Sequence, residues 1–108
     1  MTDTHPLDQL FGVIRSRRNA DPETSYTAKL FAQGTLKIAK KLGEEGVETA
    51  LAAVAEDKDA LVGESADLLY HLLVLWAARD VSPEDVYHAL ESRTQRSGLA
   101  EKAARERA

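Results

Sequence analysis

Five acidic residues have the types and spacing to bind a divalent cation. In a helix, residues three or four positions apart share one side, so the acids would form two groups. Like charges at these spacings repel, and no Lys or Arg stands at helical spacing from Glu48, Glu64 or Asp67. Carboxylate oxygens without counter-charges suit Mg²⁺ or Mn²⁺ better than zinc. The pattern therefore predicts a metal site, with a solvated acidic helix surface as the competing interpretation. The five residues are Glu44, Glu45, Glu48, Glu64 and Asp67.

Two long helices must position these acids. Helical periodicity predicts the first from about Thr35 to Ala55 and the second from about Ala60 to Ala78. The short connection "EDKD" predicts that they pack as antiparallel neighbours, which would bring the two acidic groups face to face. The apolar residues that we expect to face a core from the first helix are Leu36, Ile38, Ala39, Leu42, Val47, Ala50, Leu51 and Val54.

Shorter helices are predicted on both sides of this pair. Ser25 is placed to cap a helix through "YTAKLFAQ", which Gly34 would end, and Thr35 is placed to cap the next one. The stretch "SPED" from Ser82 resembles a capping box at the start of a last helix. An earlier helix would begin at Pro6. Its predicted apolar face is Leu7, Leu10, Phe11 and Ile14.

The predicted fold class is all-α, a helical bundle in a single domain over residues 1–108 with a frayed tail from about Thr94. The second long helix is apolar around much of its circumference between Leu68 and Trp76. One partner helix cannot cover such a surface, so we expect a homodimer to complete the bundle.

The composition excludes several classes of site. The chain has no cysteine, so it has no disulfide, thiolate nucleophile or Cys-based zinc site. A formal net charge of −4 argues against broad nucleic-acid binding, although it allows a local basic site for a phosphorylated small molecule. The N-terminus lacks the features of a signal peptide, and the longest apolar run, about 11 residues, is too short for a bilayer. A cytoplasmic protein without membrane contact is expected.

Two stretches carry a resemblance to a known family. "SYTAKLFAQGTLKIAKKLGEEGVETALAA" and "ESADLLYHLLVLWAARDVSPEDVYHAL" closely resemble the phosphoribosyl-ATP pyrophosphatases, which are MazG-like all-α pyrophosphohydrolases. The resemblance covers about residues 7 to 93. It implies Mg²⁺-dependent hydrolysis of phosphoribosyl-ATP to phosphoribosyl-AMP and pyrophosphate, the second step of histidine biosynthesis. The chain departs from the family pattern at Gly46, where Ala is usual.

The family signature, an ExxE on one helix and an ExxD on the next, implies a metal-ligand set. In this chain the set is Glu45, Glu48, Glu64 and Asp67. Glu44 is either a further ligand or the general base for water. The expected catalytic residues are thus Glu44, Glu45 and Glu48.

Basic and polar residues near the acids are candidates for substrate binding. Lys37, Lys40 and Lys41 precede the acids by one or two turns, where they would contact phosphate or serve as ordinary helix-surface lysines. Ser25, Tyr26 and Lys29 belong to the "SYTAKL" block, where Ser25 is equally suited to capping a helix. His71 is expected to be a hydrogen-bonded core residue rather than a metal ligand.

Two other functions remain open at this point. A MazG-like enzyme that hydrolyses non-standard nucleoside triphosphates would use the same metal chemistry. A non-enzymatic helical interaction module would need no metal, but it leaves the unpaired acids unexplained.

Overall fold

The computed structural model describes residues 5–94, 102 and 105–106. Its helices are α1 Pro6–Ser16, α2 Tyr26–Gln33, α3 Thr35–Ala55, α4 Lys58–Ala78 and α5 Pro83–Thr94. No strand occurs among the described residues, which confirms the all-α fold class. The tail that was predicted to fray begins at Thr94, and nearly all of it after that residue lies outside the described residues.

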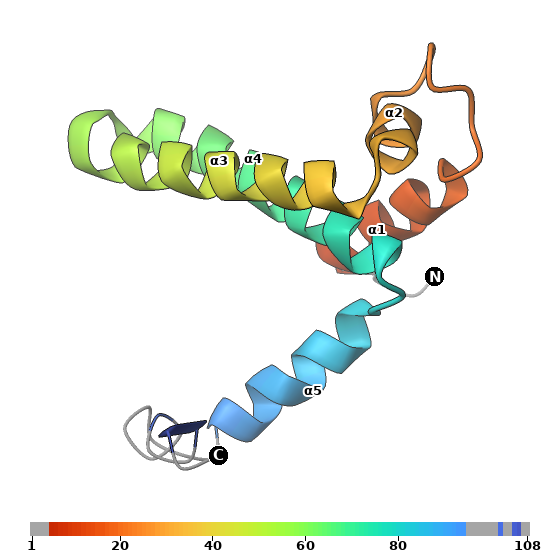
Figure 1. Cartoon of the computed structure of the whole chain (residues 1–108). Helices are drawn as coiled ribbons and strands as arrows, with labels where there is room; N and C mark the ends of the chain where they lie inside the picture. Colours follow the sequence, from red (N-terminus) through yellow and green to blue (C-terminus); the bar gives the residue numbers. More distant parts are fainter. Residues whose placement is uncertain (1–4, 95–101, 103–104, 107–108) are drawn as a thin grey trace.

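The long helices α3 and α4 form an antiparallel hairpin, as predicted, and α1 and α2 pack at its open end (Figure 1). The hairpin turn is tighter than expected. The side chain of Asp57 accepts a hydrogen bond from the Ala60 N–H at 2.9 Å, so Asp57 is the N-cap of α4. The helix therefore starts at Lys58, two residues before the predicted start.

The short helices follow from local capping. Pro6 is the first residue of α1, where its missing N–H costs nothing. Ser25 caps α2, because its Oγ accepts a hydrogen bond from the Ala28 N–H at 3.1 Å. The predicted apolar face of α1 is confirmed: Phe11 and Ile14 are buried, and Leu7 and Leu10 pack partly against the core.

The junction between α2 and α3 corrects one prediction. Gly34 ends α2, as expected, with a φ of 91° that side chains rarely adopt. Gly34 also stands at the N-cap position of α3, with no side-chain cap. Thr35 is already the first helical residue, so the prediction that it caps α3 was wrong. The two helices share one glycine because the chain turns too tightly there to leave room for a separate cap.

Helix α5 leaves the end of α4 and projects away from the hairpin (Figure 1). Its predicted capping box is present. The Asp85 N–H donates to Ser82 Oγ at 3.2 Å, and the Ser82 N–H donates to the Asp85 carboxylate at 3.0 Å. These bonds lower the pKa of Asp85.

The core lies where α1, α2, the start of α3 and the end of α4 meet. Its fully buried aliphatic side chains include Ile38 from α3 and Leu73 from α4. Among the described residues, the only buried residue of α3 outside this junction is Ala52. Most apolar burial is thus concentrated at one end of the molecule.

The predicted apolar side of α3 is only partly buried within the chain, so this prediction was wrong for most of its residues. Leu36, Val47, Leu51 and Val54 are 85%, 60%, 58% and 86% exposed. The reason is geometric. Helix α4 covers the side of α3 that carries Ile38 and Ala52, and the exposed residues lie on the other side. We call these four residues the α3 stripe.

Helix α4 is apolar all round, as the sequence indicates, yet only part of it is buried. Trp76 is half-buried, whereas Leu69 and Val62 are exposed. By length and composition α4 meets the criterion for a membrane span, with a mean hydropathy of 1.3. Core helices of soluble proteins meet the same criterion, and α4 carries Glu64, Asp67 and His71 along its length.

Candidate metal and substrate site

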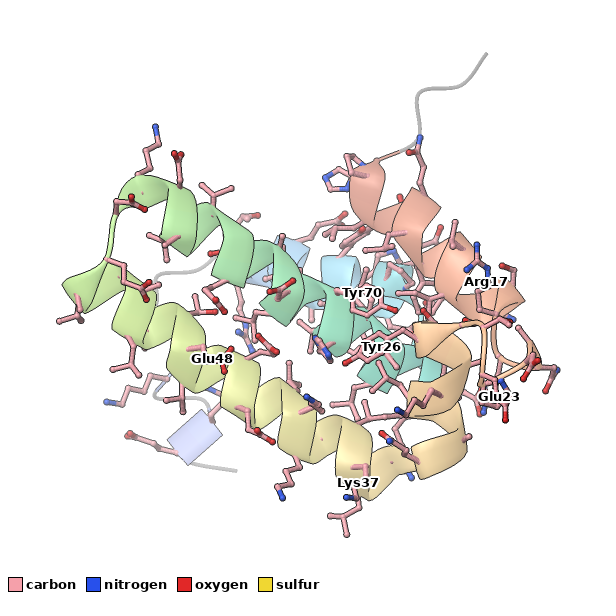
Figure 2. The ribbon with its side chains drawn as sticks, turned by 90° about the horizontal axis from the view of Figure 1, so that it is seen from above. Arg17, Glu23, Tyr26, Lys37, Glu48 and Tyr70 are labelled. Carbon is pink, nitrogen blue, oxygen red and sulfur yellow. The ribbon has the colours of Figure 1, made fainter. Side chains whose placement is uncertain are left out.

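The hairpin brings three of the predicted acids together. One carboxylate oxygen from each of Glu45, Glu48 and Glu64 lies within 4.8 Å of the others. The first two come from α3 and the third from α4, because antiparallel packing places the second half of α3 beside the first half of α4. Figure 2 shows Glu48 on the side of α3 that faces α4. We call these three residues the acidic cluster.

Two oxygens of the acidic cluster are buried without a partner. Oε2 of Glu45 and Oε2 of Glu64 accept no hydrogen bond from any described residue. Burial raises the pKa of both carboxyls, and the negative charge of Glu48 raises it further. Buried, like-charged carboxylates are costly unless a cation neutralises them. The donor set consists of carboxylate oxygens, which is what Mg²⁺ or Mn²⁺ requires.

The two remaining acids differ in their positions. Asp67 lies outside the close group of oxygens, but its charge raises the pKa of Glu45 and of Glu64, so it stands near them. Glu44 is exposed and also lies outside that group. Its place on the helix surface leaves it accessible to water, as a general base must be.

A threonine holds the two helices together at the cluster. Thr49 Oγ1 lies 2.7 Å from the carbonyl oxygen of Glu45 and 3.1 Å from that of Glu64. Its hydroxyl proton is therefore shared between two backbone acceptors, one on α3 and one on α4. This contact fixes the backbones that carry two of the three clustered acids.

The predicted phosphate-binding lysines have no acidic partner. Lys37, Lys40 and Lys41 are exposed on α3. None of the three forms an ion pair with a described acidic residue, unlike Arg18, which pairs with Asp80. Their ammonium groups are therefore available to a ligand.

Gly46, where the family usually has Ala, has room for a methyl group, since an added Cβ would meet the Leu68 side chain only at 4.0 Å.

The "SYTAKL" block lines a shallow depression beside α2. Its volume is about 520 Å³, and Ser25, Tyr26 and Lys29 contribute to its wall. Ser25 is buried and its hydroxyl caps the helix, so it supports this wall from within. Tyr26 and Lys29 are exposed to the depression. Two of the three predicted residues thus present side chains to this depression.

His71 is a buried, hydrogen-bonded residue, as predicted. Its Nδ1 lies 2.8 Å from the carbonyl oxygen of Asp67, and its Nε2 lies 3.2 Å from the hydroxyl of Tyr26. The neighbouring Tyr70 hydroxyl is hydrogen-bonded to Thr27. These contacts join α2 to α4 beside the acidic cluster.

The chain is similar to known proteins over most of its length. The family model for phosphoribosyl-ATP pyrophosphohydrolase matches residues 7–94. The chain belongs to the phosphoribosyl-ATP pyrophosphohydrolase family. A protein of Azospirillum brasilense named phosphoribosyl-ATP pyrophosphatase is 58% identical over 99 residues, 92% of this chain and 89% of that protein. Proteins with the same name from Paramagnetospirillum magneticum and Parvibaculum lavamentivorans are 58% and 59% identical, each over 95% of this chain and 94% of their own length.

The match to the phosphoribosyl-ATP pyrophosphohydrolase family spans every site residue predicted from the sequence. Two residues of the site were missed, Thr49 and Tyr70. Thr49 follows Glu45 by four positions, so a polar residue on the same side as the acids was the available indication. Tyr70 is adjacent to His71, but nothing in the sequence pairs it with Thr27.

Proposed function

We propose that this protein hydrolyses phosphoribosyl-ATP to phosphoribosyl-AMP and pyrophosphate in the cytoplasm, with Mg²⁺ or, as a substitute, Mn²⁺. One observation carries the proposal: two buried carboxylate oxygens without partners stand in a cluster of three acids, in a chain of this family. No nucleic acid or membrane takes part in this reaction.

The proposed metal ligands are Glu45, Glu48 and Glu64, with Asp67 as the fourth. Magnesium, when bound, supplies positive charge that offsets the triphosphate and activates water. The raised pKa values of Glu45 and Glu64 support this assignment, because a cation would stabilise the charged form that burial disfavours.

The remaining steps belong to side chains of the protein. Glu44 accepts a proton from the attacking water, whose oxygen bonds to phosphorus as the anhydride bond between the α- and β-phosphates breaks. Lys40 and Lys41, with Lys37 one turn away, donate hydrogen bonds to phosphate oxygens that the cation leaves uncovered. Tyr26 and Lys29 contact the rest of the substrate, and Ser25 supports them.

A turnover assay tests the proposed reaction. Phosphoribosyl-ATP is compared with a panel of standard and non-standard nucleoside triphosphates, with pyrophosphate release as the readout. We expect phosphoribosyl-ATP to have the highest kcat/KM and chelation of Mg²⁺ to abolish turnover. Preference for another triphosphate would assign the chain to a different MazG-like activity. Absence of any metal-dependent turnover would favour an interaction module.

We further propose that the protein is a homodimer in which the α3 stripe is buried. The support is the row of exposed aliphatic side chains on α3, with Val62 and Leu69 exposed on α4. Single chains rarely expose contiguous apolar surface of this kind without a partner. Light scattering at micromolar concentration should give twice the mass of one chain, and a stable monomer would contradict the proposal.

A further inference from the structure

Two adjacent side-chain contacts fasten α2 to α4. The Tyr26 hydroxyl lies 3.2 Å from His71 Nε2, and the Thr27 hydroxyl is hydrogen-bonded to Tyr70. The rings of Tyr26 and Tyr70 lie nearly parallel, with centroids 6.3 Å apart, and Figure 2 shows the two tyrosines side by side between α2 and α4. Because each helix contributes two consecutive residues, the contacts fix the rotation of α2 as well as its position.

The hydrogen bonds of His71 have a defined direction. The carbonyl oxygen of Asp67 can only accept, so Nδ1 of His71 carries the proton that bridges their 2.8 Å separation. In the neutral ring, Nε2 is then an acceptor and receives the hydroxyl hydrogen of Tyr26. The ring is 5% exposed and is held at both nitrogens. A continuous chain of hydrogen bonds therefore runs from Tyr26 through His71 to the backbone of Asp67.

This chain ends beside the acidic cluster. Asp67 is the proposed fourth ligand, and His71 lies one turn after it on α4, with Nδ1 2.8 Å from its carbonyl oxygen. At the other end, Tyr26 is 52% exposed and lines the depression beside α2 together with Lys29. Tyr26 thus borders the proposed substrate surface and is linked, through the His71 imidazole, to the backbone of one proposed metal ligand.

We propose that Tyr26 is a positioning residue. Its hydrogen bond to His71 holds the depression beside α2 at a fixed position relative to the acidic cluster. A triphosphate that contacts both is then aligned with the attacking water. The inference rests on the metal site and the substrate surface proposed above. Misplacement of reacting groups by about 1 Å can cost about 100-fold in rate. Because the hydroxyl bonds to His71 and not to the substrate, its loss should lower kcat and leave KM nearly unchanged.

Tyr26→Phe removes the hydroxyl and keeps the ring. At saturating Mg²⁺ we expect kcat for phosphoribosyl-ATP to fall about 10- to 100-fold, as expected when reacting groups are misplaced by up to about 1 Å. KM, and the Mg²⁺ dissociation constant measured by calorimetry, should each change by less than about threefold. His71→Asn can still donate to the Asp67 carbonyl but cannot reach Tyr26, so it should lower kcat similarly. The double variant should be no slower than the slower single variant, since both remove one interaction.

Tyr87→Phe is the matched control. The Tyr87 hydroxyl donates to the Asp8 carboxylate at 3.0 Å and joins α5 to α1, so its removal also breaks one inter-helix hydrogen bond. It touches no proposed site residue. We expect a similar fall in melting temperature and a kcat within twofold of the unchanged protein, which separates helix anchoring from positioning.

Three results would overturn the inference. The first is a kcat within twofold of the unchanged protein for Tyr26→Phe. The second is an equal loss of kcat in Tyr87→Phe. The third is normal kinetics for Tyr26→Phe with a raised KM for Tyr26→Leu, which would mean that Tyr26 acts only through contact of its ring with the substrate and not through its hydroxyl. Failure of the metal site itself is recognised separately, because Glu48→Gln would then leave the calorimetric Mg²⁺ signal unchanged.

Discussion

The two ends of this molecule differ in whether their apolar side chains are buried and their polar side chains find partners within a single chain. At the junction of α1, α2 and α4, apolar residues are buried and polar ones are partnered. Arg18 donates to the Ala77 carbonyl at 3.0 Å, pairs with Asp80 at 3.7 Å and lies over the ring of Phe31. Along the α3–α4 hairpin, by contrast, aliphatic side chains are exposed and two carboxylate oxygens are buried without partners. The side chains of the junction find their partners within one chain, whereas the hairpin leaves carboxylate oxygens without partners and aliphatic side chains exposed, which is why we propose a cation and a second chain there.

The largest expected effect comes from the acidic cluster. Glu48→Gln and Asp67→Asn each remove the charge from a proposed ligand while keeping its shape. We expect turnover to fall by at least about 1000-fold, because ligand charge is needed to hold the cation that the triphosphate requires. Circular dichroism should show an unchanged helix content. Near-normal turnover at low Mg²⁺ in either variant would mean that the ligand set is wrongly placed.

The lysines of α3 should have the next largest effect. Lys40→Met and Lys41→Met should each lower kcat/KM by about 30- to 1000-fold, which is typical for groups that stabilise charge in a transition state. Calorimetric Mg²⁺ binding should not change. Lys58→Met, an exposed lysine at the start of α4, is the matched control and should cost less than about threefold. Normal turnover in both α3 variants would move the phosphate site to the depression beside α2.

The α3 stripe can be tested by charge. Val47→Glu places a carboxylate on the surface that we propose is buried between two chains. It should weaken the dimer at least about 100-fold, since an unpaired charge is costly in an apolar interface. Val13→Glu changes a valine of α1 that is 48% exposed and lies outside the stripe, so it should leave the dimer intact. Sedimentation velocity over a concentration series would distinguish the variants, and equal dissociation in both would contradict the assigned interface.

The smallest expected effect is on the pH dependence of stability. The pKa values of Glu45 and Glu64 are raised in the folded chain above the ordinary 4.5, so the folded state binds more protons than the unfolded state between the two values. Unfolding free energy should therefore rise in chelator as pH falls from neutral toward 4.5, and should level off below that value. Saturating Mg²⁺ should reduce this slope, and Glu64→Gln should flatten it further. A melting temperature that falls in chelator as the pH is lowered over this range would contradict the raised pKa values.

Much of this protein could be predicted from its sequence, because the determining interactions are local. Helical periodicity and caps fix the elements: Ser25, Gly34 and the Ser82–Asp85 pair act within a few residues of their position. The spacing of Glu45 and Glu48 places them on one side of a helix whatever the helix packs against. The all-α class followed from these patterns, the family from the resemblance of two long stretches to known sequences, and both are confirmed.

Tertiary structure decided what lies across from each side chain. The sequence alone could not show that α4 covers Ile38 and Ala52 and leaves Val47 and Val54 exposed, since both sides of α3 are apolar. It could not show that Thr49 lies between two helices, or that Tyr26 meets His71 across a separation of 45 residues. Such contacts depend on the angle and register at which helices pack. Many side chains set that packing together, so no local pattern specifies it.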